Sequence, residues 1–401
     1  MNRVILHQKV TKKNDMNPSS FELRYPAVIR FGWGVRRELP MLLRELTQGL
    51  DLVPVFLVAS RSALQGPCLE EFKTLCGSGL EGIFTEVPHD PSLATVNAII
   101  ARIRETGAAV VIAVGGGSVI DAAKAAAAVA PFGPAVEPFF HGKQALSKPG
   151  LPLVALPTTA GSGAEVTLNA VLTDADRRVK KSLRSLYMAP KAALVDVELT
   201  MSQPREQTAW SGLDAFTQAL ESYLSRKTHS VSRILAIQAM KQLLRFLPAA
   251  VNDGADREAR TAVAEGSLLS GMAFSQSGLG AVHGLAHPLG VALNLPHGYT
   301  CAVLLPHILA LNAPVCSTEF QELALAFGLP DGAAVQSVVQ MLCRDLDVPP
   351  DFRAHGLSER HFPEILANCR SNSMQANPRE LTDTEILSLL RQLSEGTPLH
   401  P

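Results

Sequence analysis

The chain has 401 residues, of which 47% are hydrophobic and 18% are charged, and its formal net charge is −1. This balance of acidic and basic side chains leaves no field of one sign that would attract nucleic acid or an anionic membrane surface. The six cysteines are scattered and no pair has CxxC spacing, which indicates neither a zinc ribbon nor a disulfide scaffold. We therefore expect reduced thiols in a cytoplasmic protein.

Residues 1–20 are polar and lack the apolar region of a secretory signal, so we interpret them as a flexible extension. No apolar run in the chain reaches the roughly 18 residues of a membrane span. We expect no membrane association.

Residues 21–203 alternate short apolar runs with helical stretches, which predicts an α/β domain with a mostly parallel sheet. Continuous apolarity is typical of parallel strands covered on both faces. The predicted strands lie in the segments 54–60, 108–118, 151–163 and 192–200. Helices are predicted for 93–107, with Gly107 as its C-cap, and for 118–130, with Ser118 as its N-cap.

After Pro204 the strand signals nearly vanish and helical patterns continue to the end of the chain. We therefore place a domain boundary near residue 203 and predict an all-helical second domain over 204–401.

Two polar loops follow predicted strands and suit a cofactor phosphate. The first contains three glycines and a serine ahead of a helix, where free N–H groups and the helix dipole attract anions. The second ends the strand at 157 with hydroxyl side chains, and ligands of open α/β sheets bind at such strand ends. The alternative is turn chemistry without a ligand. The loop residues are Gly115, Gly116, Gly117 and Ser118, and then Thr158, Thr159 and Ser162.

Three of the eleven histidines, His283, His287 and His297, fall in one mostly apolar segment, 280–298. Burying imidazole costs free energy unless it is hydrogen-bonded or bound to a metal. His283 and His287 share a helix face if the helix is regular, although Pro288 would disturb it. His297 is expected in a loop. The alternative is three ordinary core or surface histidines.

Asp214 and Gln218 are four residues apart in a predicted helix, 212–224, and so share a face. One carboxylate and two or three imidazoles would suit Zn²⁺ or Fe²⁺. The alternative is that Asp214, in the first helical turn, only complements the helix dipole.

The chain resembles the iron-containing (group III) alcohol dehydrogenases over roughly residues 25–395. The resemblance lies in seven segments that occur in the family's order: GGGSVIDAAK, LPTTAGSGAEVT, VDVELT, SGLDAFTQALESY, GLGAVHGLAHPLG, LPHG and NPRELTDTEI. It implies a dinucleotide-binding α/β domain and an all-helical metal domain, with the active site between them. The implied reaction moves hydride between a nicotinamide cofactor and an alcohol or aldehyde, while Fe²⁺ or sometimes Zn²⁺ acts as a Lewis acid.

The resemblance also implies roles for individual residues. Asp214, His283 and His297 match the family's metal ligands, and His287 matches its proton-relay histidine. The cofactor positions are matched by Gly115, Gly116, Gly117, Ser118, Asp121, Thr158, Thr159 and Ser162.

The chain departs from the family at two positions. Gln218 replaces a metal-binding histidine, and an amide oxygen is the weaker ligand, so zinc or a loosely held metal becomes more credible. Ser60 stands where many members carry an acid that repels a 2′-phosphate, and Arg61 follows it. This pair slightly favours NADP over NAD, unless Arg61 is simply solvated.

The basic segment 177–184 would admit an acidic substrate, although a solvated charge run is the favoured interpretation. We predict an NAD(P)-dependent, metal-dependent alcohol dehydrogenase or aldehyde reductase acting on a small alcohol or aldehyde, and forming a homo-oligomer, a dimer by analogy. The alternatives are a metal-independent reductase of the maleylacetate reductase type and a non-catalytic cofactor-binding homologue.

Overall fold

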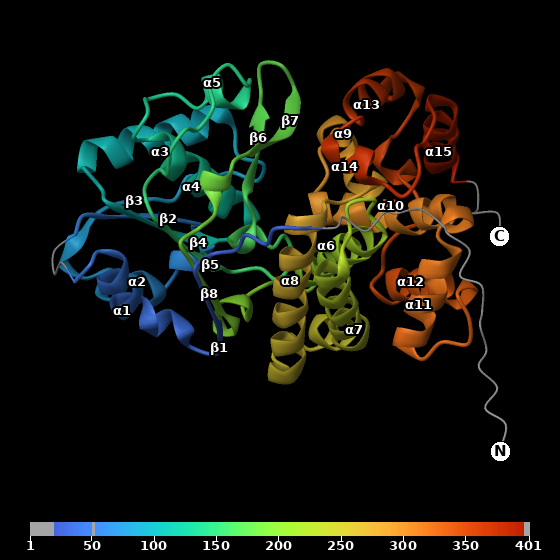
Figure 1. The fold of residues 1–401 in the computed structure, drawn as a ribbon, viewed down its shortest axis with the longest axis horizontal. Coiled ribbons are helices and arrows are strands. Elements are labelled where there is room, and N and C mark those ends of the chain that lie inside the picture. Colours follow the sequence, from blue (N-terminus) through green and yellow to red (C-terminus); the bar gives the residue numbers. More distant parts are fainter. Residues whose placement is uncertain (1–19, 50–52, 397–401) are drawn as a thin grey trace.

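The computed structural model describes residues 20–49 and 53–396, which form an α/β part and a helical part side by side (Figure 1). The extension predicted for residues 1–20 lies almost entirely outside the described residues. The change from strands to helices falls between residues 196 and 205. The domain boundary near residue 203 stays a prediction.

The α/β part is built on a six-stranded sheet in which neighbouring strands are parallel, in the order β1-β8-β5-β4-β2-β3. Its strands are β1 (Val28–Gly32), β2 (Val55–Ala59), β3 (Leu80–Phe84), β4 (Val110–Gly115), β5 (Leu153–Pro157) and β8 (Ala192–Asp196). Every residue of β2, β4, β5 and β8 is buried. The strand prediction from continuous apolar runs is therefore confirmed.

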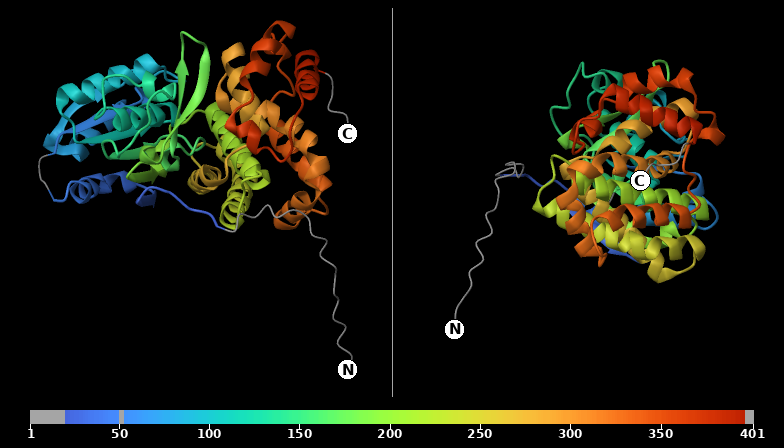
Figure 2. Two further views of the ribbon diagram at one scale, coloured as in Figure 1. Left: turned by 45° about the horizontal axis from the view of Figure 1, so that its top comes forward. Right: turned by 90° about the vertical axis from the view of Figure 1, so that its right-hand side faces the viewer.

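Helices cover both faces of this sheet, as the left view of Figure 2 shows. Phe56 and Val58 of β2 pack with α3 and α4, whereas Val55 and Leu57 pack with α1 and α2 on the other face. The helices are α1 (Leu39–Leu46), α2 (Cys68–Cys76), α3 (Leu93–Thr106), α4 (Gly117–Val129) and the short α5 (Glu137–Phe140). The short 3₁₀ turns are η1 (Val35–Glu38), η2 (Ser62–Leu64), η3 (Gly77–Gly79), η4 (Ala164–Val166), η5 (Leu186–Met188) and η6 (Val197–Thr200).

The predicted helix ends are confirmed for α3 and wrong for α4. Ser92 caps α3, and Gly107 ends it in the left-handed conformation at φ 63°. The N-cap of α4 is Gly116 rather than Ser118, because the helix already begins at Gly117. The Ser118 hydroxyl instead accepts a hydrogen bond from the Asp90 backbone N–H at 3.3 Å.

An antiparallel hairpin stands between the two parts (light green in Figure 2). It consists of β6 (Asn169–Asp174) and β7 (Val179–Arg184), and β7 contacts helix α9 of the helical part. The hairpin thereby lies between the parallel sheet and the helical part.

The described residues from Arg205 onward form helices and no strands, as predicted. The long helices are α6 (Arg205–Leu224), α7 (Ser230–Asn252), α8 (Arg257–Ser277), α9 (Ala281–Leu293) and α10 (His297–Asn312). They are followed by η7 (Ala313–Val315), α11 (Ser317–Phe327), α12 (Ala333–Asp345), η8 (Arg353–His355), η9 (Glu359–His361), α13 (Phe362–Asn368), α14 (Asn372–Ala376) and α15 (Asp383–Glu395).

Two helical segments are long and apolar enough to cross a membrane by length and composition alone, Ser230–Asn252 and His297–Val315. Both contribute to the main core of the helical part, α7 through Leu243 and Leu247 and α10 through Leu304 and Leu305. Because their apolar sides face other helices, they have the character of core helices.

Three local expectations around the histidines and Asp214 are wrong. Helix α6 begins at Arg205, so Asp214 lies in mid-helix and cannot complement the dipole of a first turn. Helix α9 continues through Pro288, and Leu285 and Leu289 on either side of it are fully buried. His297 is the first residue of α10 and not part of a loop.

Candidate active site

A cavity of about 760 Å³ lies where the two parts meet. The glycine loop and the second polar loop line it from the sheet, and the hairpin and the helical part close it on the other sides. The sequence-predicted residues that line it are Gly116, Gly117, Ser118, Asp121, Thr159, Ser162, Asp214, Gln218, His283, His287 and His297. Both halves of the predicted site therefore face one space.

The two cofactor loops meet because β4 and β5 are neighbours in register, with Gly115 beside Pro157. A Cβ atom on Gly117 would lie 2.6 Å from the Ser162 hydroxyl oxygen, so only glycine leaves room between the loops. The N-terminus of α4 opens onto the cavity, where first-turn N–H groups suit a phosphate.

Three predicted cofactor residues, Ser60, Gly115 and Thr158, are not among the residues that line the cavity. Gly115 packs against Val119, because a Cβ there would lie 2.6 Å from the Val119 Cβ. The Thr158 backbone N–H donates to the Gly115 carbonyl at 3.0 Å, and that of Ser60 donates to Val114 at 2.9 Å. These contacts shape the loops, and a direct cofactor contact for the three stays a prediction.

Asp121 lines the cavity but is also tied to the protein. Its carboxylate accepts a hydrogen bond from the Val171 backbone N–H at 2.9 Å and lies 3.8 Å from the Lys124 ammonium. Burial raises the pKa of Asp121 to about 6, against the opposing charge of Lys124. Holding α4 against β6 is thus one role of Asp121, and cofactor contact remains an expectation.

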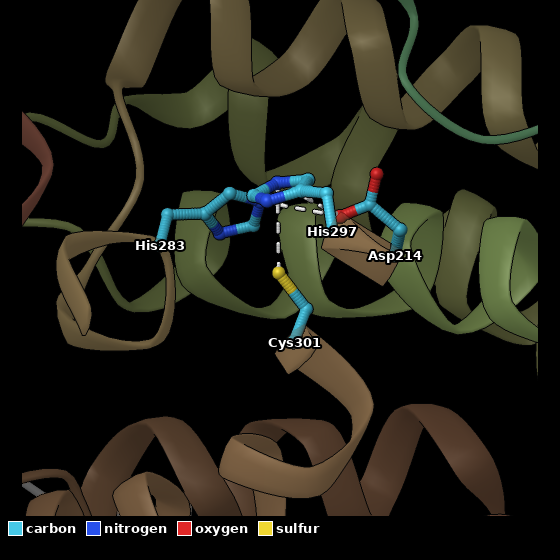
Figure 3. Close-up of side chains that lie close together, drawn as sticks. All are labelled: Asp214, His283, His297 and Cys301. Carbon is cyan, nitrogen blue, oxygen red and sulfur yellow. Dashed lines mark hydrogen bonds and ion pairs between the residues drawn. The ribbon is translucent and has the colours of Figure 1, made fainter. Parts of the chain in front are cut away.

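Four side chains from three helices converge on one point, as Figure 3 shows. Asp214 comes from α6, His283 from α9, and His297 and Cys301 from α10, and their donor atoms all lie within 4.8 Å of one another. Asp214 Oδ1 is 3.3 Å from His283 Nε2 and 3.8 Å from His297 Nε2.

The atoms that face this point lack other partners. Asp214 Oδ1 and His283 Nε2 are buried and have no hydrogen bond of normal geometry among the described residues. Leaving such atoms unsatisfied costs free energy, and a bound cation would satisfy both. The donor set therefore fits a divalent metal.

Glu221 fixes the orientation of the His283 ring. Its carboxylate accepts a 2.6 Å hydrogen bond from His283 Nδ1 and another of 2.6 Å from the Val282 backbone N–H. With Nδ1 engaged in this way, the lone pair of Nε2 points toward Asp214. Glu221 was not predicted from the sequence, although Asp214, Gln218 and Glu221 follow the spacing of one helix face.

The electrostatics of the three histidines differ. For His283, burial opposes the charged ring, but Cys301, Glu221 and Asp214 outweigh it and raise its pKa well above the usual range. Burial, together with the neighbouring His287 ring and the Lys180 ammonium, holds the pKa of His297 well below that range. Burial also lowers the pKa of His287 to about 3. A positive charge is thus favoured where His283 faces Asp214 and Cys301, but not at the other two rings.

Gln218 lines the cavity and is hydrogen-bonded to Asp214. Its amide nitrogen donates to Asp214 Oδ2 at 3.0 Å, and Ser270 donates to its amide oxygen at 3.5 Å. Gln218 therefore orients Asp214, and its predicted role as a metal ligand remains untested.

His287 lies on α9 one turn beyond His283, and its ring stacks on that of His297 at a centroid distance of 5.0 Å. It lines the cavity next to the donor cluster. A neutral imidazole in that position can accept a proton at one nitrogen and release one from the other.

Most basic side chains of the hairpin interact with neighbouring acidic or aromatic side chains. Lys180 bonds to Asp90 at 2.7 Å, Lys181 lies over the Phe140 ring, and Arg177 contacts Asp174 at 3.4 Å. Arg184 lines the cavity without an ion-pair partner among the described residues, and burial lowers its pKa. Arg177, Lys181 and Arg184 are exposed, as the favoured interpretation of a solvated charge run requires, whereas the Lys180 side chain is only 7% exposed.

Comparison with known proteins identifies related chains. The family model for the Fe-containing alcohol dehydrogenase family, C-terminal, matches residues 208–394, and that for iron-containing alcohol dehydrogenase matches residues 26–197. An NAD-dependent methanol dehydrogenase of Bacillus methanolicus is 32% identical, over 80% of this chain and 87% of that protein. A lactaldehyde reductase of Escherichia coli K12 is 33% identical, over 77% of this chain and 82% of that protein.

The crystal structure of sulfoacetaldehyde reductase from Bifidobacterium kashiwanohense in complex with NAD⁺ is similar in fold, with a TM-score of 0.87. The two sequences are 28% identical, and the match covers 94% of this chain and 99% of that one.

Proposed function

We propose that this chain, which belongs to the iron-containing alcohol dehydrogenase family, transfers hydride between a nicotinamide cofactor and a small alcohol or aldehyde. A divalent metal would assist the transfer. The observation that carries the proposal is the shared cavity, which holds both the glycine loop and the buried Asp214–His283–His297 cluster. The two reactants of a hydride transfer need such a common space.

Different groups of the protein would bind the cofactor, bind the metal and transfer the proton. The N-terminus of α4, Thr159 and Ser162 would hold the cofactor pyrophosphate, and Asp214, His283 and His297 would hold the metal. When bound, the metal supplies Lewis-acid polarisation of the substrate oxygen. His287, which is neutral near pH 7, would accept a proton at one ring nitrogen while the other releases one toward solvent.

The cofactor is further proposed to include NADP(H). Ser60 follows β2 without a carboxylate, and the exposed Arg61 has the exposed Glu86, at 3.4 Å, as its one ion-pair partner within the part of the chain that the structure describes. Because an exposed ion pair contributes at most about 1 kcal/mol, Arg61 is available to a 2′-phosphate. A cytoplasmic location and a dimeric state stay predictions. Sedimentation analysis would test the dimeric state.

The deciding experiment measures oxidation of NADH and NADPH with a panel of small aldehydes, before and after chelation, in the parent and in His283→Ala. We expect activity that falls on chelation and returns with added Fe²⁺ or Zn²⁺, and a loss of at least about 100-fold in His283→Ala. His307→Ala, which removes a histidine hydrogen-bonded to the Pro350 carbonyl, is the matched control.

Two results would contradict the proposal. Full activity after chelation would indicate the metal-independent alternative, which leaves the buried Asp214 Oδ1 without a hydrogen bond of normal geometry among the described residues. Cofactor binding without turnover across the panel would indicate a non-catalytic homologue.

A further inference from the structure

We propose that Cys301 is a fourth protein ligand of the metal, replacing the histidine that Gln218 has displaced, and that the resulting donor set selects Zn²⁺ over Fe²⁺. The proposal rests on the proposed function only in taking the Asp214–His283–His297 cluster as the metal centre. Neither the sequence motifs nor the resemblance assigns a role to Cys301.

The position of Cys301 follows from where α10 begins. His297 is the first residue of that helix and Cys301 lies four residues later, so both side chains project from one face. Cys301 is fully buried, and its Sγ lies 3.6 Å from His297 Nε2 (Figure 3). The thiol thus points at the ring edge that also faces Asp214.

The distances between the donor atoms fit a tetrahedral site. With metal bonds of about 2.0 Å to nitrogen or oxygen and about 2.3 Å to sulfur, tetrahedral angles place two nitrogen or oxygen ligands about 3.3 Å apart and a sulfur about 3.5 Å from each of them. The Asp214–His283 separation of 3.3 Å and the Cys301–His297 separation of 3.6 Å match these values, whereas the Asp214–His297 separation of 3.8 Å is longer and would shorten on binding.

Two other buried thiols of the helical part have different surroundings. Cys343 Sγ faces the Ala302 carbonyl at 3.9 Å, and Cys369 Sγ faces the Leu366 carbonyl at 3.4 Å. In each contact a neutral thiol donates a hydrogen bond to a backbone carbonyl oxygen. The contact of Cys301 with an imidazole, beside an unsatisfied carboxylate oxygen, instead resembles a set of metal ligands.

The chemistry of the set favours zinc. Thiolate is a soft donor that zinc accepts readily, whereas an all-nitrogen and oxygen set is better suited to Fe²⁺. On binding, the Cys301 S–H bond breaks, its proton leaves to solvent and an S–metal bond forms. The negative charges of Asp214 and the Cys301 thiolate then balance the two positive charges of the metal. Zinc can add a fifth ligand, which leaves a place for the substrate oxygen.

The first test is the absorption spectrum of the full-length protein loaded with Co²⁺ in place of zinc. Thiolate ligation gives a sulfur-to-cobalt charge-transfer band in the near ultraviolet, which nitrogen and oxygen ligands do not give. We expect this band in the parent and in Cys343→Ser, and its loss in Cys301→Ser. Zn²⁺ affinity should fall by at least about 100-fold in Cys301→Ser and stay unchanged in Cys343→Ser.

A parent protein that binds Co²⁺ without the band, or a Cys301→Ser variant that keeps it, would overturn the proposal. The proposed function would survive either result if activity still depended on a metal. A parent that binds neither Co²⁺ nor Zn²⁺ would overturn both together.

X-ray absorption of the zinc-loaded parent keeps the proposal falsifiable if Cys301→Ser does not fold. We expect one sulfur neighbour at about 2.3 Å, and its absence would contradict the assignment. The double variant Cys301→Ser with Gln218→His would restore an imidazole, and we expect it to regain metal affinity without regaining the charge-transfer band.

Discussion

The Glu221 carboxylate accepts a hydrogen bond of 2.6 Å from His283 Nδ1, while the opposite nitrogen of the same ring faces Asp214 at 3.3 Å. The imidazole is thereby held between a carboxylate that orients it and the donor cluster. Such a partner fixes the tautomer of a ligand histidine and raises its basicity.

Replacing Glu221 should therefore loosen the metal without removing a ligand. We expect Glu221→Gln to lower metal affinity by about 10- to 100-fold. Titration of the chelated protein with Zn²⁺ measures this change, and Glu206→Gln, an exposed acid on the same helix, is the control. Equal affinity in the two variants would show that His283 is oriented without Glu221.

The residues after β2 should set the cofactor preference. We expect Arg61→Ala to raise KM for NADPH by about 10-fold and to leave KM for NADH nearly unchanged, because a charge-assisted hydrogen bond contributes about 1.5–3 kcal/mol. Ser60→Asp should act more strongly in the same direction by repelling the 2′-phosphate. Arg102→Ala, an exposed arginine of α3, is the control. Parallel changes for both cofactors would contradict the prediction.

Arg184 should favour substrates that carry a negative charge. It lines the cavity on the same strand face as Lys180, and the described residues give it no ion-pair partner. We expect Arg184→Ala to raise KM for a carboxylate-bearing aldehyde by about 10-fold and to change KM for a neutral aldehyde of similar size by less. Arg177→Ala, whose guanidinium lies near Asp174 and His141, is the matched control. Equal effects on both aldehydes would exclude charge recognition.

Glu385, at the N-terminus of α15, should make the free energy of unfolding depend on pH in the acidic range. The Thr382 backbone N–H and Arg379 lower the pKa of Glu385 from 4.5 to about 2, so the folded state binds fewer protons than the unfolded state in that interval. The stabilisation is present above about pH 4.5 and is lost as the pH falls toward 2.

Glu385→Gln should then lower the free energy of unfolding at neutral pH by up to about 1 kcal/mol, since the pair with Arg379 is partly exposed. Urea unfolding of the two proteins at several pH values tests this. Their stabilities should converge as the pH falls to about 2, and a constant difference down to pH 2 would contradict the assignment.

The main architecture was predictable because its signals are local. Continuous apolar runs are found as buried parallel strands, and Gly107 ends α3 as expected. The positions of Asp214, His283 and His297 followed from the family resemblance, and the structure brings all three together.

The remaining features depend on helix boundaries that the sequence conceals. The first turns of α6 are polar and lack a capping side chain, so its start at Arg205 was missed. Because Pro296 precedes His297, the segment resembled a loop, although proline also stands readily at a helix start. With His297 placed in a loop, its spacing from Cys301 carried no meaning. Glu221 was missed because its partner His283 is distant in sequence.

The donor cluster joins three helices, α6, α9 and α10, that approach one another only in the folded chain. A bound ion would therefore act as a crosslink as well as a reagent, because the unfolded chain holds no preformed site for it. Its binding free energy adds directly to the stability of the helical part, and the melting temperature should rise with the free metal concentration. Loss of the ion would first loosen the packing of α9 against α10, which is where hydrogen exchange should accelerate.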